Sequence, residues 1–226
     1  MSNRIRISIG IALLALALAV PAAAQAQERT VAVSGEATLK VPNDSASAGF
    51  SVSRERRSRG AALRAVSSDL GAVIAAVQTI PGVGAGDVTS GRISVAKRSR
   101  GQRTVYRASE GIGVTLHKPE EAGNLFAAAI RAGASGVSGP NYFVGDTEAA
   151  FAKALAAAFD SARAKAAALA AEAGASLGPV LAIEEGGGGE LVPEGSAKTA
   201  PVTVQPPTKP GTSTVTATVH VVFALQ

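Results

Sequence analysis

The chain has 226 residues, of which 46% are hydrophobic and only 4% aromatic, and its formal net charge is +5. It contains no cysteine, which excludes disulfides and makes the protein indifferent to redox conditions. Its basic excess is too small for the electrostatic footprint of a nucleic-acid-binding protein, so we expect no nucleic acid as a partner.

The first 26 residues predict a secretory signal peptide. Arg4 and Arg6 precede an apolar run over 7–20, and Ala24-Gln25-Ala26 matches a cleavage site. A membrane anchor is the alternative, but the run is short for a span of about 20 residues. We therefore expect a mature chain, 27–226, that is periplasmic or secreted, has no transmembrane anchor after cleavage, and forms a single domain.

The first half of the mature chain predicts two strands, a helix and a hairpin. Residues 30–41 and 46–53 alternate between apolar and polar residues, as strands with one buried face do. An apolar stripe predicts a helix over 59–79, followed by a mobile glycine-rich loop over 82–91. Residues 93–116 then read as a hairpin around Ser99-Arg100-Gly101-Gln102.

A short helix should open at Pro119 and stop at Gly133, with Leu125, Phe126, Ala129 and Ile130 facing inward. A strand over 137–144 follows, with Gly139-Pro140 as a bulge.

The most strongly marked element is a helix over 148–173. Asp146 or Thr147 can cap its first turn, and Gly174 supplies the left-handed stop. We expect its buried stripe to consist of the apolar residues at spacings of three and four, namely Phe151, Leu155, Phe159, Ala162, Ala166 and Leu169.

Two strands, over 180–185 and 213–225, flank a Gly/Pro-rich segment, 186–211, which we interpret as a flexible insertion. The order of elements predicts an α+β fold in which a curved, mostly antiparallel sheet carries one long and two shorter helices on one face.

Two basic clusters are the candidate site residues. The first holds Arg54, Arg56, Arg57 and Arg59; the second holds Lys97, Arg98, Arg100, Arg103 and Arg107. The favoured interpretation is a solvated hairpin tip whose charges protect a sheet edge from aggregation. The alternative is contact with anionic envelope phosphates, of lipid headgroups or lipopolysaccharide, through arginine forks.

Other motifs carry little chemistry. Gly174–Gly178 matches G-x-S-x-G around Ser176, but a helix precedes it and a strand follows, the reverse of a nucleophile elbow. His117 and His220 are the only histidines, and alternation places both on outward strand faces. Zinc sites use closer ligands or cysteines, so we expect no metal, and no phosphate- or dinucleotide-binding motif implies a cofactor.

The chain contains five segments in this order: VSGEATLKVPNDSASAGFSV, YRASEGIGVTL, AGNLFAAAIRAGASGVSGPNYF, ALAAAFDSARAKAAALAAEAGASLGPVLAIEE and PPTKPGTSTVTATVHVVFAL. Together they resemble the SIMPL-domain family. The resemblance implies an exported envelope protein with an α+β fold, in some members a large ring-like homo-oligomer, and it brings no catalytic residues. The arginine-rich segments and the glycine run at 186–189 depart from the family pattern.

The resulting expectation is a non-enzymatic, self-assembling protein that supports envelope integrity or stress tolerance. The role in stress follows from the resemblance alone. The alternative is a binding module for anionic envelope components that uses the two basic clusters.

Overall fold

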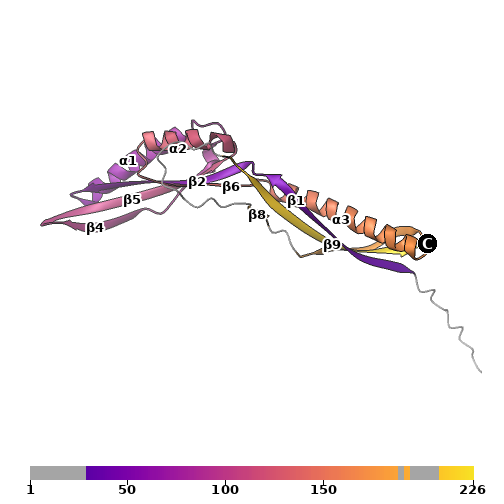
Figure 1. Cartoon of the computed structure of the whole chain (residues 1–226). Coiled ribbons are helices and arrows are strands. Elements are labelled where there is room, and N and C mark those ends of the chain that lie inside the picture. The colour runs from indigo at the N-terminus through magenta and orange to yellow at the C-terminus, as the bar shows by residue number, and fades with distance from the viewer. Residues whose placement is uncertain (1–28, 188–190, 194–208) are drawn as a thin grey trace, which may run out of the picture.

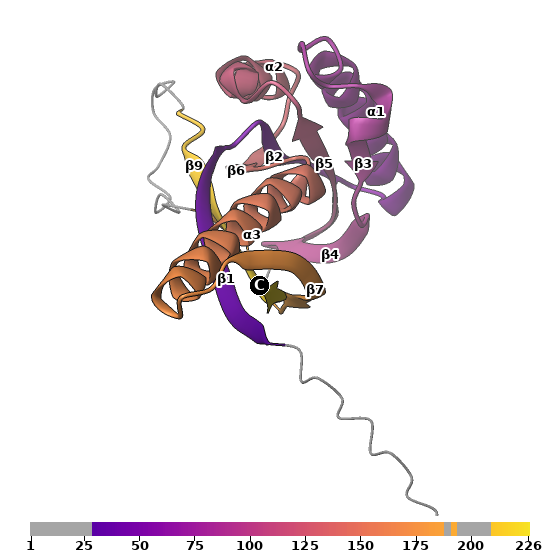
Figure 2. The same ribbon diagram turned by 90° about the vertical axis from the view of Figure 1, so that its right-hand side faces the viewer.

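The computed structural model describes residues 29–187, 191–193 and 209–226. The molecule is elongated, with two antiparallel sheets placed end to end and the helices on the same side of both (Figure 1). Figure 2 shows α3 running along the strands of one half, while α1 and α2 cover the other half.

The first half of the molecule is sheet A with its helix. Sheet A has the strand order β1 (Thr30–Pro42), β9 (Thr212–Leu225) and β7 (Leu177–Gly186), and the short β8 (Leu191–Pro193) also pairs with β9. Helix α3 (Thr147–Glu172) covers β1 and β9. Its 26 residues extend about 39 Å, which is close to the roughly 44 Å of the 13-residue β1.

The second half is sheet B with two helices. Its strand order is β3 (Val88–Ser90), β5 (Arg103–Leu116), β2 (Ser45–Arg56) and β6 (Gly136–Phe143), and β4 (Ser94–Arg100) pairs with the outer part of β5. Helices α1 (Arg59–Val77) and α2 (Ala122–Arg131) pack on one face of this sheet, and the short 3-10 helices η1 (Ala85–Asp87) and η2 (Pro119–Glu121) lie in the connections.

Alanines fill the fully buried row of the long helix against sheet A, and its large side chains Phe151, Leu155 and Phe159 pack half-buried beside that row. Ala150, Ala154, Ala158, Ala162, Ala166 and Ala170 are all buried, at 0–4% exposure. A spacing of four advances about 40° per step around a helix with 3.6 residues per turn. The buried row therefore winds around α3, and it stays in contact with strands that twist in the same way.

Gly35 of β1 provides the closest approach between sheet A and α3. A Cβ placed on Gly35 would lie 2.0 Å from the carbonyl oxygen of Ala158 and 2.7 Å from the Cβ of Ala162. Only a residue without a side chain fits there, because the helix backbone occupies the space.

Asn43 and Asp44 join the two halves. The Asn43 side chain donates to the Pro210 carbonyl at 2.8 Å and accepts from the Ser213 hydroxyl at 2.6 Å. The Asp44 carboxylate accepts from the backbone N–H of Gly145 at 2.7 Å and from the Ser45 hydroxyl at 3.0 Å. The two chain crossings between the sheets, near 43–44 and 144–146, are thereby tied to each other.

The predicted α+β class, the antiparallel pairing and the placement of helices on one side are confirmed. The expected curved sheet is divided into two hydrogen-bonded sheets. The Asp146 carboxylate caps α3 at the Ala149 N–H, and Gly174 has a left-handed φ of 66°.

Three local expectations were wrong. Leu169 and Ile130 are 52% and 51% exposed rather than inward-facing, because neighbouring alanines occupy the contact positions. The loop over 82–91 is not a structureless loop but contains η1 and β3, which pairs with β5.

Within the range 186–211, residues 191–193 form β8, while 188–190 and 194–208 lie outside the described residues.

Helix α1 is long and apolar enough, by length and composition alone, to cross a membrane. Its buried residues Leu70, Val73 and Val77 belong to the main core between this helix and sheet B, and Ala62 and Val66 belong to a smaller cluster.

Replacement of Gly35 by alanine should destabilise the protein by about 1–3 kcal/mol, because the new methyl group forces α3 away from β1. Chemical denaturation of the purified chain measures this change. The matched control is Gly71→Ala on the exposed side of α1, where a Cβ meets nothing within 4 Å. That control should stabilise by up to about 1 kcal/mol, and equal effects of the two substitutions would contradict the packing argument.

Candidate functional site

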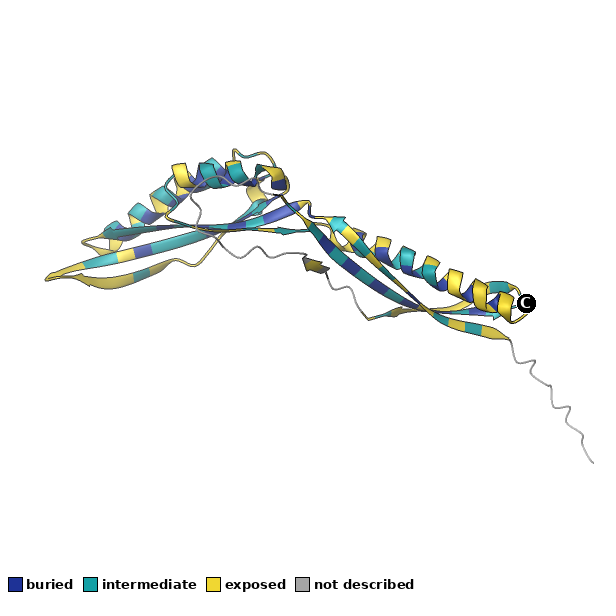
Figure 3. Cartoon of the chain, viewed as in Figure 1, coloured by how far each residue is buried: buried dark blue, intermediate teal, exposed yellow. Residues whose placement is uncertain are grey.

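The two basic clusters meet at the far end of sheet B. Antiparallel pairing of β2 with β5 sets Arg56 opposite Tyr106, and pairing of β4 with β5 sets Arg100 opposite Arg103. The end of β2 and the β4–β5 hairpin therefore lie side by side, at the tip drawn at the left of Figure 1. The residues at this tip are largely exposed (Figure 3).

Strand alternation divides these basic residues between the two faces of the sheet. Arg98, Arg100, Arg103 and Arg107 belong to the face that carries no helix, which we call the open face of sheet B. Two contacts establish this side: the Arg107 Nε donates to the Ser53 hydroxyl at 2.8 Å, and the Ser94 and Ser109 hydroxyls lie 3.0 Å apart.

The remaining cations lie on the helix side. Arg54 forms an ion pair with Asp69 of α1, which places the alternate β2 residues 54 and 56 on that face. Lys97 is the cross-strand partner of Tyr106, which packs against Ala62 and Val66 of α1. Arg57 and Arg59 flank Ser58, whose hydroxyl caps α1.

Within the part of the chain that the structure describes, two of the nine basic residues have a carboxylate partner. Arg54 pairs with Asp69, and Arg100 pairs with Glu55 at 3.1 Å although its side chain is 72% exposed. Among the described residues, Arg98 and Arg103 form no ion pair with an acidic side chain. The open face therefore carries uncompensated positive charge next to one neutralised arginine.

A shallow groove lies further along the same open face. It has a volume of about 400 Å³, and the open-face residues that line it are small, namely Gly49, Ser51, Gly111, Gly136 and Ser138. Ser53 and Ser109 connect this groove to the arginines, because they are the next residues of β2 and β5 on the same face.

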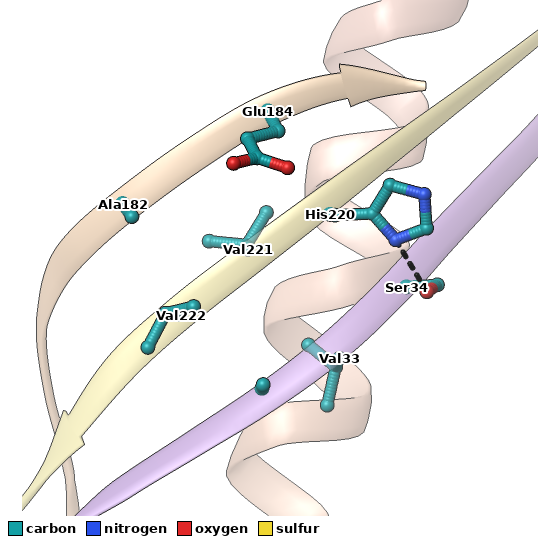
Figure 4. Close-up of a pocket in the computed structure, with 8 residues that line it drawn as sticks. Val33, Ser34, Ala182, Glu184, His220, Val221 and Val222 are labelled. Atoms are coloured by element: carbon teal, nitrogen blue, oxygen red, sulfur yellow. Dashed lines mark hydrogen bonds between the residues drawn. The ribbon is translucent and has the colours of Figure 1, made fainter. Parts of the chain in front are cut away.

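Sheet A has a separate hollow on its own open face (Figure 4). Its volume is about 250 Å³, and His220, Ser34 and Glu184 contribute polar side chains to it from three neighbouring strands. The His220 Nδ1 lies 2.8 Å from the Ser34 hydroxyl, and Glu184 lies across from His220 on β7. Figure 4 shows the Glu184 carboxylate on the other side of β9 from this bond.

The remaining candidates are held in structural roles. The Ser176 hydroxyl donates to the carbonyl of Gln226 at 3.4 Å and follows α3, so it is not on a nucleophile elbow. His117 follows the end of β5 and is not in a strand, contrary to the expectation, while His220 lies in β9 of sheet A. The two histidines are therefore not on adjacent strands. Within the described part of the chain, no group of three or more potential metal ligands is found.

His117 has a partner that the sequence did not indicate. Its Nε2 lies 3.0 Å from the Asp87 carboxylate, and its backbone N–H donates to the Gly82 carbonyl at 2.9 Å. The other oxygen of Asp87 accepts from the Gly84 N–H at 2.7 Å. This backbone hydrogen bond, and then the bond to His117, hold the pKa of Asp87 below its ordinary value of 3.8.

The family described as SIMPL, a protein of unknown function (DUF541), matches residues 31–223. The chain therefore belongs to the SIMPL family, as its five segments predicted. The match extends from β1 to the last residues of β9 and thus includes both halves of the molecule. A search of curated proteins gave no match.

An NMR titration should find the Asp87 carboxyl with a pKa below 3.8. The stabilisation of the 82–88 turn by this carboxylate is then complete above pH 3.8 and is lost as the pH falls through the folded-state pKa. His117→Ala should return the pKa of Asp87 only part of the way to 3.8, because the Gly84 N–H still donates to the carboxylate. A wild-type midpoint at or above 3.8 would contradict the assignment.

Proposed function

We propose that this SIMPL-family protein is an exported, non-enzymatic protein that self-associates in the cell envelope and supports envelope integrity or stress tolerance. The start of the sequence supports export, since it has the charge and apolar pattern of a signal peptide. The observation that carries self-association is the apolar edge of sheet A.

That edge is β7. Among the described residues, no strand pairs with its outer side, so its backbone N–H and C=O groups on that side are available to another strand. Val180, Leu181 and Ile183 are 38%, 47% and 56% exposed, since α3 covers β1 and β9 rather than β7. An exposed apolar edge strand is a template for pairing with another chain.

A second copy of this chain is the occupant that we propose for the β7 edge. Two such edges can pair about a two-fold axis, each presenting the same surface to the other. Apolar residues that face water in the single chain would then be buried by their counterparts.

Light scattering across micromolar concentrations tests this proposal. The double substitution Leu181→Lys with Ile183→Lys should weaken self-association about tenfold or more, because charge on an edge strand opposes pairing. The matched control is Leu169→Lys with Ile130→Lys, which changes two equally exposed apolar residues on helices. A wild-type protein that stays strictly monomeric would overturn self-association. Equal weakening by the control would show that β7 is not the edge through which the copies associate.

The basic end of sheet B favours a second candidate function, the binding of anionic envelope phosphates. The supporting observation is that Arg98 and Arg103 lie on an exposed sheet face and, within the described residues, form no ion pair with a carboxylate. Arginine forks bind phosphate in a bidentate manner.

Vesicles that contain anionic phosphatidylglycerol are the probe for this second function, with uncharged phosphatidylcholine vesicles as the control. We expect the mature protein to sediment with the anionic vesicles at low salt and to be released at high salt, since screening weakens exposed charges. Binding that is equal for both vesicle types, or absent, would exclude a headgroup interaction.

A further inference from the structure

Arg98 and Arg103, which have no carboxylate partner among the described residues, lie on the same continuous surface as the groove. Charge and groove together indicate both the charge and the shape of a ligand. Arg103 and Gly111 are eight residues apart on β5, on the same face of the sheet. At 3.4 Å per residue this separation is about 27 Å. A ligand that contacts both ends must therefore be an extended chain.

We propose that the open face of sheet B binds an extended anionic oligosaccharide. Its acidic groups, phosphate or carboxylate, lie on Arg98, Arg103 and Arg107, and its sugar hydroxyls lie along the groove beside Ser51 and Ser138. The proposal deepens the second candidate function, on which it rests, by naming the face of the sheet and the class of ligand.

The arginines select the acidic groups. Arg98 on β4 and Arg103 on β5 are diagonal neighbours, since Arg100 pairs with Arg103 and Arg98 with Val105. Diagonal neighbours on a sheet are close enough for long side chains to converge on one group. Arg107 uses its Nε for Ser53 and has two further terminal nitrogens. Its position on β5, between Arg103 and Gly111, extends the basic row toward the groove.

The rest of the face suits hydroxyl groups. Apart from the arginines, the open-face positions of β2, β4 and β5 hold serine, glycine, threonine and alanine, together with Glu55 and Val105. Serine hydroxyls donate and accept hydrogen bonds, as a sugar requires. The glycines leave the sheet backbone low, so a flat ring can lie close to it.

The same composition argues against other polyanions. The open-face positions of these three strands have no aromatic side chain on which nucleic-acid bases could stack. Val105 is the one apolar side chain larger than alanine at these positions, which distinguishes them from a membrane-inserting surface. An anionic saccharide matches both the charge and the hydroxyl lining.

Isothermal titration calorimetry of the full mature chain tests the proposal. The probes are an oligogalacturonate, which carries carboxylates, a phosphorylated oligosaccharide of similar length, and a neutral maltooligosaccharide. We expect at least one anionic probe to bind and the neutral probe not to bind. Binding should weaken with salt, as for any exposed charge pairing.

Two pairs of variants locate the binding face. Arg98→Gln with Arg103→Gln should weaken binding about tenfold or more, because charge-assisted hydrogen bonds are lost. Lys97→Gln with Arg56→Gln removes the same charge from the helix side of β4 and β2 and should change binding less than about twofold. Ser138→Glu should weaken binding at the groove. Ser68→Glu, at an exposed position of α1 on the helix side, makes the same change away from the groove and should not.

Several results would overturn the proposal. The first is an equal loss of binding in the Arg98/Arg103 double variant and in the Lys97/Arg56 double variant. The others are binding of the neutral probe as tight as that of the anionic probes, or no binding of either anionic probe. Vesicle binding without saccharide binding would refute this inference and leave the second candidate function standing. Absence of both vesicle binding and saccharide binding would overturn this inference and the second candidate function, and the proposal of self-association would be unaffected.

Tighter binding of single-stranded DNA than of either saccharide, lost in the same arginine variant, would also overturn it. Thermal unfolding of each variant shows whether it is folded. If Arg98→Gln with Arg103→Gln unfolds early, the single Arg103→Gln variant at the hairpin end decides the question, with Lys97→Gln as its control.

Discussion

The contact between an alanine row and a single glycine determines how the sheet A half is built. Helix α3 lies along β1 and β9 at a distance that only short side chains permit, and Gly35 is the point of closest approach. Because interiors are close-packed, this short distance leaves no space for larger groups between helix and sheet. Phe151, Leu155 and Phe159 therefore flank the contact and close its margin, half-buried.

That contact also explains what the sequence could and could not predict. Helix ends, strand alternation and the hairpin follow from local patterns, so α3, β2, β9 and the β4–β5 hairpin were placed to within a few residues. The predicted buried stripe of α3 was wrong in part, because it followed apolar residues at mixed spacings of three and four, whereas the buried alanines recur at every fourth residue. Close approach of helix to sheet favours alanine, and only the opposing glycine reveals it.

The candidate site was predictable as a set of residues but not as a surface. The two basic segments are obvious in the sequence, and their meeting at one end of the sheet required only the pairing of β2 with β5. Their division between two faces depends on register, since a shift by one residue exchanges the faces. The partners Glu55 and Asp69 depend on the same register, and so no local signal identified them.

The junction at Asn43 and Asp44 bears on how such a molecule is assembled. Everything in sheet B, with its two helices, comes from the continuous stretch 45–143, while sheet A is composed of the chain on either side. Asp44 and Gly145, bonded at 2.7 Å, mark where this stretch leaves and returns. In topological terms, sheet B and its helices form a single insertion between β1 and α3, so the chain passes from one half of the molecule to the other only at this junction and back.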